Sequence, residues 1–137
     1  MVNQEELYQF IVKEQWKEII DILYSYREDI KTDPLLSFAS KTFVTEFLGK
    51  VNNYSRSRSD ITEHLETLYT LHHGKFYILS DENYKKLVLE IVNRKSLNQA
   101  YGYATIFPNE EICKKIISDY RFQKVKEEGY KLKEPQI

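Results

Sequence analysis

Residues 33–48 read DPLLSFASKTFVTEFL, and this pattern predicts a capped, amphipathic helix. Asp33 is placed to accept hydrogen bonds from the free amides of the first turn, and Pro34 suits the first helical position, where a missing N–H loses no bond. The apolar residues that follow recur close to the 3.6-residue helical period and form one face: Leu35, Phe38, Ala39, Phe43 and Phe47. Because such a face has to be shielded from water, we expect neighbouring segments to pack against it.

The segments before this helix show the same period. Residues 4–13 and 15–31 are each expected to form a helix, with Leu7 on the apolar face of the first and Trp16 and Leu23 on that of the second. The connections between the three helices are short. Short connections make consecutive helices pack antiparallel, so we expect that arrangement here.

Three more helices are predicted after a polar break at residues 51–59. Asp60 is expected to cap the first of them, and Ser80 or Asp81 the second. Asn109 is expected to cap the last, with acidic residues in its first turn that complement the helix dipole. The N-terminal and C-terminal parts of the chain therefore contribute three predicted helices each.

Residues 75–107 permit a second interpretation. The segment 86–92 is apolar enough to be a buried strand, and 103–107 has the composition of a strand. An α+β fold with a small sheet within residues 75–107 is therefore the alternative. The length of the capped pattern in this region favours a helix.

We predict an all-α fold in which about six helices pack as antiparallel pairs, either as a helical bundle or as a TPR/HEAT-like array. The paired layout is similar to that of tetratricopeptide and HEAT repeats, although their diagnostic repeat residues are absent. The whole chain, residues 1–137, is expected to form a single helical domain with a polar loop at 51–59 and a frayed tail at 127–137.

Composition narrows the class of protein. The 20 basic and 21 acidic residues nearly balance, which argues against wholesale binding to nucleic acid or to an anionic membrane. The single cysteine, Cys113, excludes an intramolecular disulfide. The N-terminus lacks the basic-then-apolar order of a secretory signal, and no apolar run is long enough to cross a bilayer. We expect a soluble, cytoplasmic protein with no membrane contact.

No pattern in the sequence supports catalysis or cofactor binding. His64 and His72 lie eight residues apart and His73 is adjacent to His72, whereas paired zinc ligands on one helix are typically four residues apart. The four glycines are isolated, so there is no Gly-rich phosphate loop, and no serine-centred nucleophile elbow occurs. We expect no metal, no cofactor and no enzymatic activity; an enzyme that used His64 or His72 would need a pocket joining it to a carboxylate.

Two basic segments suggest nucleic-acid binding as the alternative function. Residues 56–58 place two guanidinium groups between serines just before a helix N-terminus, a pattern suited to phosphate. Residues 114–126 add further cations with aromatic residues between them. The residues expected to contact nucleic acid in that case are Arg56, Arg58, Lys114, Lys115, Arg121 and Lys124.

Aromatic residues favour a different leading function. The 11 tyrosines and 7 phenylalanines exceed what one small core needs, and tyrosine concentrates binding energy because its rigid ring buries a large area at low entropic cost. We expect a non-enzymatic protein–protein interaction module, an adaptor or a regulatory or inhibitor-type protein, whose partner is another protein. The expected contact residues are Tyr24, Tyr54, Tyr69, Tyr101 and Tyr103.

Overall fold

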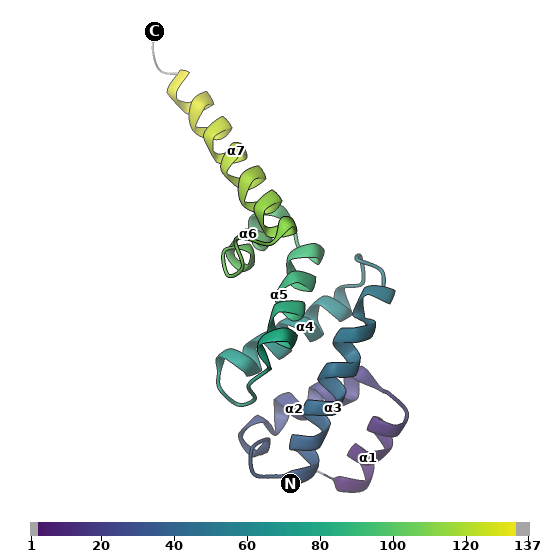
Figure 1. Cartoon of the computed structure of the whole chain (residues 1–137). Helices are drawn as coiled ribbons and strands as arrows, with labels where there is room; N and C mark the ends of the chain where they lie inside the picture. Colours follow the sequence, from purple (N-terminus) through teal and green to yellow (C-terminus); the bar gives the residue numbers. More distant parts are fainter. Residues whose placement is uncertain (1–2, 134–137) are drawn as a thin grey trace.

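The computed structural model describes residues 3–133, and all of the regular secondary structure in that range is helical (Figure 1). The α-helices are α1 (Gln4–Val12), α2 (Trp16–Ser25), α3 (Pro34–Lys50), α4 (Ser59–His73), α5 (Asp81–Arg94), α6 (Leu97–Ala104) and α7 (Glu111–Lys133). Two 3₁₀ turns, η1 (Arg27–Asp29) and η2 (Val51–Asn53), follow α2 and α3. The all-α prediction is confirmed, and residues 75–107 contain no strand, so the alternative with a small sheet is wrong.

The caps of α3 and α5 form as predicted. Asp33 Oδ1 accepts hydrogen bonds from the amides of Leu35 and Leu36 at 2.9 and 3.2 Å. Ser80 Oγ accepts one from the amide of Asn83 at 3.2 Å. These bonds satisfy N–H groups that have no partner inside the helix, which is why the two helices begin where they do.

Three of the predicted boundaries are wrong. Asp60 does not cap α4: the helix begins at Ser59, and Asp60 lies in its first turn, where its carboxylate takes a hydrogen bond from Arg58 instead. The expected helix over residues 15–31 ends at Ser25 and gives way to η1. The last helix begins at Glu111, one residue later than a cap at Asn109 would place it.

The second half of the chain holds one helix more than we expected. Residues 97–104 form α6, which includes Tyr101 and Tyr103. Residues 127–133 continue α7 as helix, although we expected the tail to fray there. The remainder of that tail, residues 134–137, lies outside the described residues. None of the described helices is both long enough and apolar enough to cross a lipid bilayer.

The buried face of α3 differs from the predicted stripe. Ala39, Phe43 and Phe47 are buried as expected, but the Phe38 side chain is 54% exposed. Leu35 is half-buried, whereas Leu36 is fully buried. The reason is that α1, α2 and α5 all pack on α3, so the buried face is set by the combined contacts of three neighbours and leaves Phe38 outside.

Helix α5 connects two apolar cores. Its Leu87 and Ile91 join the larger core, which takes side chains from α1, α2, α3 and α4. Its Val88 and Val92, displaced by one residue, join a smaller core with residues of α6 and α7. The two apolar faces of this single helix therefore fix α6 and α7 onto the remainder of the protein.

Candidate functional site

Tyr24 is the one exposed side chain among the five tyrosines expected to contact a partner. It lies on α2, and the Arg27 guanidinium is 4.6 Å from the centroid of its ring. Arg27 Nη1 also donates to the Tyr24 carbonyl oxygen at 2.9 Å. The arrangement leaves the phenol ring accessible while its orientation is held by a cation–π contact.

Tyr69 and Tyr103 belong to an aromatic cluster where α4, α5 and α6 meet. Their rings form an edge-to-face pair with centroids 5.0 Å apart. On the other side, the Tyr69 ring lies 4.1 Å from His73, whose Nε2 is hydrogen-bonded to the Tyr84 hydroxyl at 2.9 Å. Burial raises the pKa of both Tyr84 and Tyr103. Since Tyr69, Tyr84 and Tyr103 pack against both cores, these rings join the two halves of the fold.

The remaining two tyrosines are half-buried by contacts within the chain. Trp16 Nε1 donates a hydrogen bond to the Tyr54 hydroxyl at 2.9 Å. The Tyr101 ring stacks on Tyr120 of α7 with centroids 3.9 Å apart. Tyr54, Tyr69, Tyr101 and Tyr103 are thus partly covered by contacts within the chain, which leaves less of each ring available to a partner.

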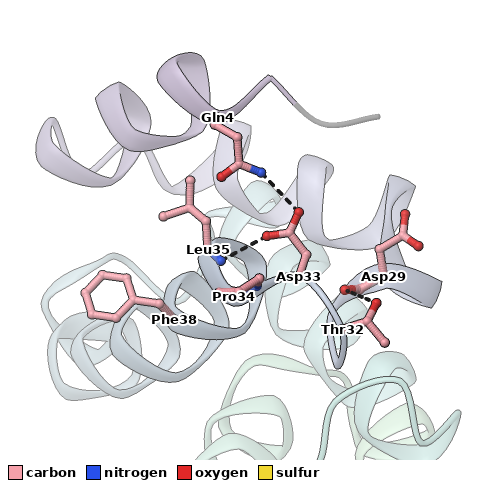
Figure 2. Close-up of a pocket in the computed structure, with 7 residues that line it drawn as sticks. All are labelled: Gln4, Asp29, Thr32, Asp33, Pro34, Leu35 and Phe38. Atoms are coloured by element: carbon pink, nitrogen blue, oxygen red, sulfur yellow. Dashed lines mark hydrogen bonds between the residues drawn. The ribbon is translucent and has the colours of Figure 1, made fainter.

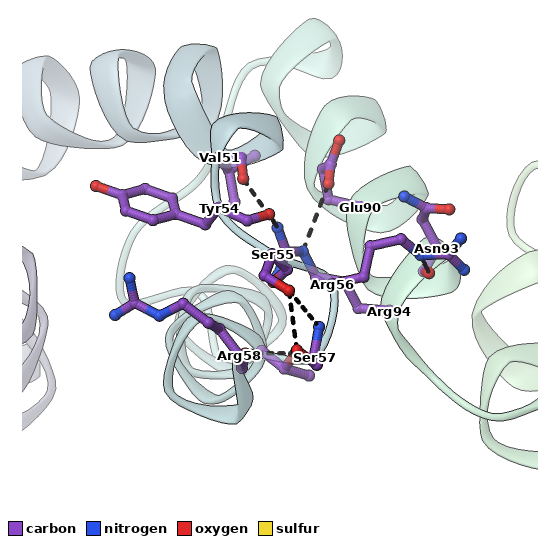
Figure 3. A network of polar contacts seen from close by, with 10 residues as sticks. Val51, Tyr54, Ser55, Arg56, Ser57, Arg58, Glu90, Asn93 and Arg94 are labelled. Carbon is purple, nitrogen blue, oxygen red and sulfur yellow. Dashed lines mark hydrogen bonds and ion pairs between the residues drawn. The ribbon is translucent and has the colours of Figure 1, made fainter.

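Arg56 and Arg58 belong to the loop before α4, beside a polar network whose central residue is Arg94 (Figure 3). Arg56 Nε donates to the Asn93 carbonyl oxygen at 2.9 Å, and Arg58 Nε donates to the Asp60 carboxylate at 3.1 Å. Beside them, the buried Arg94 guanidinium donates to the carbonyl oxygens of Val51, Tyr54 and Ser55. Both of the arginines expected to bind phosphate therefore already have partners in the chain.

The other expected nucleic-acid contacts are placed along α7. Lys115 forms an ion pair with Asp119 at 2.8 Å, and Lys124 one with Glu127 at 3.5 Å. Lys114 and Arg121 are exposed and form no ion pair within residues 3–133. These two cations are consequently the ones available to an incoming anionic group.

His64 and Cys113 are buried and His72 is half-buried, whereas His73 is exposed. Burial lowers the pKa of His64 and of His72, although nearby carboxylates such as Asp60 and Asp81 oppose the shift. Burial, with a smaller contribution from Glu110, raises the pKa of the Cys113 thiol. Among the residues that the structure describes, no group of three or more His, Cys, Asp and Glu side chains is placed to hold a metal ion.

An open groove runs between the start of α1 and the start of α3, and we call it the α1–α3 groove. Two adjoining depressions of about 740 Å³ each form it, and they share Gln4 and Leu35. Gln4 Nε2 reaches across from α1 to donate to Asp33 Oδ2 at 3.0 Å (Figure 2). Figure 2 also shows the Leu35 side chain directed toward α1 and the Phe38 side chain projecting to one side of α3.

The α1–α3 groove combines apolar and acidic side chains. Tyr8 of α1 is 57% exposed and Phe38 of α3 is 54% exposed, and half-buried Leu35 lies in both depressions. Four acidic residues also line it: Glu5, Glu6, Asp29 and Asp33. None of these four forms an ion pair within the described part of the chain.

This groove was not predicted from the sequence, because Leu35 and Phe38 were both expected on the buried face of α3. One signal in the sequence points to it. Phe38 and Phe47 are nine residues apart, and at about 100° per residue they project from opposite sides of a helix. Phe38 and Phe47 therefore cannot both face the same core, so one of the two must be covered by another part of the protein or be exposed.

Comparisons with known proteins return no relative for this chain. No family model, no curated protein and no solved structure matches the sequence.

Proposed function

We propose that this chain is a non-enzymatic protein–protein interaction module, of the adaptor or regulatory type, and that it binds its partner in the α1–α3 groove. The observation that carries the proposal is the exposure of Tyr8 and Phe38, two large apolar side chains that border one groove together with Leu35. Contiguous apolar surface of this kind is typical of binding sites, and aromatic residues dominate the affinity of protein interfaces.

The charges around the groove define the chemistry of the partner. Glu5, Glu6, Asp29 and Asp33 surround its apolar surface and have no cation of their own within residues 3–133. A partner segment with apolar side chains flanked by lysine or arginine complements such a groove. We also propose a cytoplasmic location, with which the free, buried thiol of the single cysteine is compatible.

Photo-crosslinking in cells tests the proposal. A photoreactive amino acid at position 38 is expected to trap a partner, which mass spectrometry identifies and which is then purified. Phe38→Asp should weaken binding of that partner about tenfold or more, because an aromatic contact at the centre of an interface is lost and a charge is buried. Ile78→Asp is the matched control, since Ile78 is 62% exposed and lies outside the groove. Position 38 trapping no protein would rule out the groove as a binding site.

Nucleic-acid binding is the second candidate, and the observation that favours it is that Lys114 and Arg121 of α7 form no ion pair with any residue whose side chain the structure describes. Such binding would weaken steeply with salt, since each neutralised phosphate releases counterions. Arg121→Gln should then reduce both the affinity for a DNA or RNA duplex and the salt dependence. A chain that binds neither duplex at low salt would eliminate this candidate.

A further inference from the structure

Helix α7 extends well beyond its contacts with the other helices. Its first turns pack on α5 and α6 through Cys113, Ile116 and Ile117, and further along the helix Tyr120 stacks on Tyr101 of α6. The segment 121–133 then continues as helix for about 20 Å at 1.5 Å per residue. Figure 1 shows this part projecting away from the remaining helices.

A projecting helix of this length gains little stability on its own. Isolated helices shorter than about 12–15 residues are marginal in water, because most helical stability in proteins comes from tertiary packing of an apolar face. Phe122 and Val125 nevertheless lie in the projecting segment, 68% and 67% exposed. The segment is therefore suited to packing against a second molecule, which would cover these two side chains.

One side of the projecting segment is apolar with a cation at each edge, and we call it the α7 outer face. At about 100° per residue, Val125 and Phe122 are neighbours around the helix, with Arg121 beside Val125 and Lys126 beside Phe122. Lys126 Nζ indeed lies 5.8 Å from the centroid of the Phe122 ring. Arg121 forms no ion pair with any described residue, so its charge is available to a partner.

The α7 outer face matches the α1–α3 groove in both apolar spacing and charge. Phe122 and Val125 are three residues apart on one helix, as are Leu35 and Phe38 on the other. The cations of α7 would meet the carboxylates that border the groove, Glu5, Glu6 and Asp29, which lack cations of their own within the described part of the chain. Opposite charges across an interface fix the orientation of docking and speed association.

We propose that the occupant of the α1–α3 groove is the α7 outer face of a second copy of this chain, so that molecules associate head to tail. The inference rests on the proposed role of the groove as a binding site. The contact has to be intermolecular, because α7 projects from the end of the molecule opposite α1 and the start of α3 (Figure 1). It joins two different surfaces, so the association continues from copy to copy unless a ring closes.

The test measures the mass of the full chain by sedimentation velocity across a range of concentrations. The weight-average mass of the wild type is expected to rise with concentration, and the association to weaken when salt is raised from about 0.05 to about 0.5 M, because the charges are screened. Phe38→Asp and Phe122→Asp should each weaken self-association about tenfold or more. Ile78→Asp, an equally exposed apolar position outside both surfaces, should associate like the wild type.

Mixing the two variants distinguishes head-to-tail docking from other modes. The Phe38→Asp chain retains an intact α7 outer face, and the Phe122→Asp chain retains an intact α1–α3 groove. An equimolar mixture is therefore expected to form a heterodimer that grows no further, whereas neither variant assembles alone. A mixture that remains monomeric would mean that the groove and the α7 outer face do not pair with each other. Undiminished assembly of Phe38→Asp alone or of Phe122→Asp alone would mean that the surface left intact pairs with its own copy, and either result overturns the inference.

Failure of the inference and failure of the proposed function give different results. A wild-type chain that stays monomeric at every concentration, while position 38 crosslinks a different protein, overturns the inference and leaves the groove as a binding site. Self-association that survives Phe38→Asp also overturns the inference. A monomeric chain in which position 38 crosslinks nothing overturns both.

Discussion

Trp16 on α2 donates its indole N–H to the hydroxyl of Tyr54, which lies 38 residues later, after η2. The donor–acceptor distance is 2.9 Å, and the bond is partly buried. The Trp16 ring also packs on Phe43 of α3, with centroids 4.7 Å apart. Tyr54 therefore helps to fix the connection between α3 and α4 onto α2, in addition to any role in binding.

Replacing Tyr54 by phenylalanine is expected to lower the free energy of unfolding by about 1 kcal/mol. The substitution keeps the ring but leaves the Trp16 N–H without its acceptor in a partly buried site. Urea denaturation followed by tryptophan fluorescence measures the change, since Trp16 is the one tryptophan. Tyr24→Phe on the exposed side of α2 is the control and should change stability by less than about 0.5 kcal/mol. Equal effects of the two substitutions would contradict the structural role of the bond.

Arg94→Met is expected to destabilise the protein by about 2–4 kcal/mol. The Arg94 side chain is 1% exposed and donates to three backbone carbonyls of residues 51–55 (Figure 3). The Val51 and Ser55 carbonyls also accept from the amides of Tyr54 and Arg58, but the substitution removes all three bonds to the guanidinium from a partly buried site. Arg56→Met is the matched control, because Arg56 is exposed and reaches a single carbonyl, and it should cost less than about 1 kcal/mol. Arg94→Lys should restore little of the stability lost in Arg94→Met, since an ammonium group cannot reproduce the planar set of guanidinium donors. If Arg94→Met is as stable as Arg56→Met, the network does not anchor the loop.

Stability is expected to fall as the pH drops below about 6.5, because His64 has its pKa lowered by burial against Phe47. A lowered histidine pKa means that the unfolded chain binds a proton at a pH where the folded chain does not. Between the folded-state pKa and about 6.5, the free energy of unfolding therefore rises with pH. The loss is complete once the pH is below the folded-state pKa. His72, whose pKa is also lowered, contributes with the same sign.

The measurement is the free energy of urea unfolding at about pH 7.5 and about pH 5.5, compared between the wild type and His64→Gln. The glutamine variant is less stable at neutral pH because it disturbs the core, but its stability should fall less on acidification. In the double variant His64→Gln/His72→Gln, the free energy of unfolding should depend on pH even less. A pH dependence that both variants share with the wild type would show that carboxylates alone account for it.

The sequence predicts those features of the fold that depend on residues close together along the chain. The Asp33 and Ser80 caps were predicted because each depends on residues within three positions along the chain. Helix α6 was missed because its fully buried residues are two alanines, Ala100 and Ala104, which give little hydrophobic period. The extent of α7 was missed for the same reason, since its last turns have no packed face that a pattern could reveal.

The candidate site was less predictable than the fold. A groove between α1 and α3 depends on how residues 4–9 pack beside residues 29–38, and no local pattern encodes that distance. Tyr69 and Tyr103 were expected to contact a partner because tyrosines off the main stripe look free, yet the junction of α4, α5 and α6 packs them together. Composition indicated more aromatic residues than one core needs, but it did not indicate which of them the fold would bury.

Cys113 provides a probe of the attachment of α7. Its thiol is fully buried between α5, α6 and α7, and burial raises its pKa. A thiol in such a site stays protonated and out of reach of reagents until the helices separate.

We expect Cys113 to react with a disulfide reagent at about pH 8 at least 100-fold more slowly in the folded protein than in urea, because reaction requires local opening. Tyr120→Ala removes the stack on Tyr101, in which the ring centroids are 3.9 Å apart. It should speed the reaction in the folded protein about 2- to 10-fold, which corresponds to the interaction energy of one aromatic pair. Phe122→Ala should leave the rate unchanged, since Phe122 is 68% exposed and lies outside the α6–α7 contact. If the thiol reacts at its unfolded rate, or if the two alanine variants react alike, the Tyr101–Tyr120 stack does not hold α7 against α6.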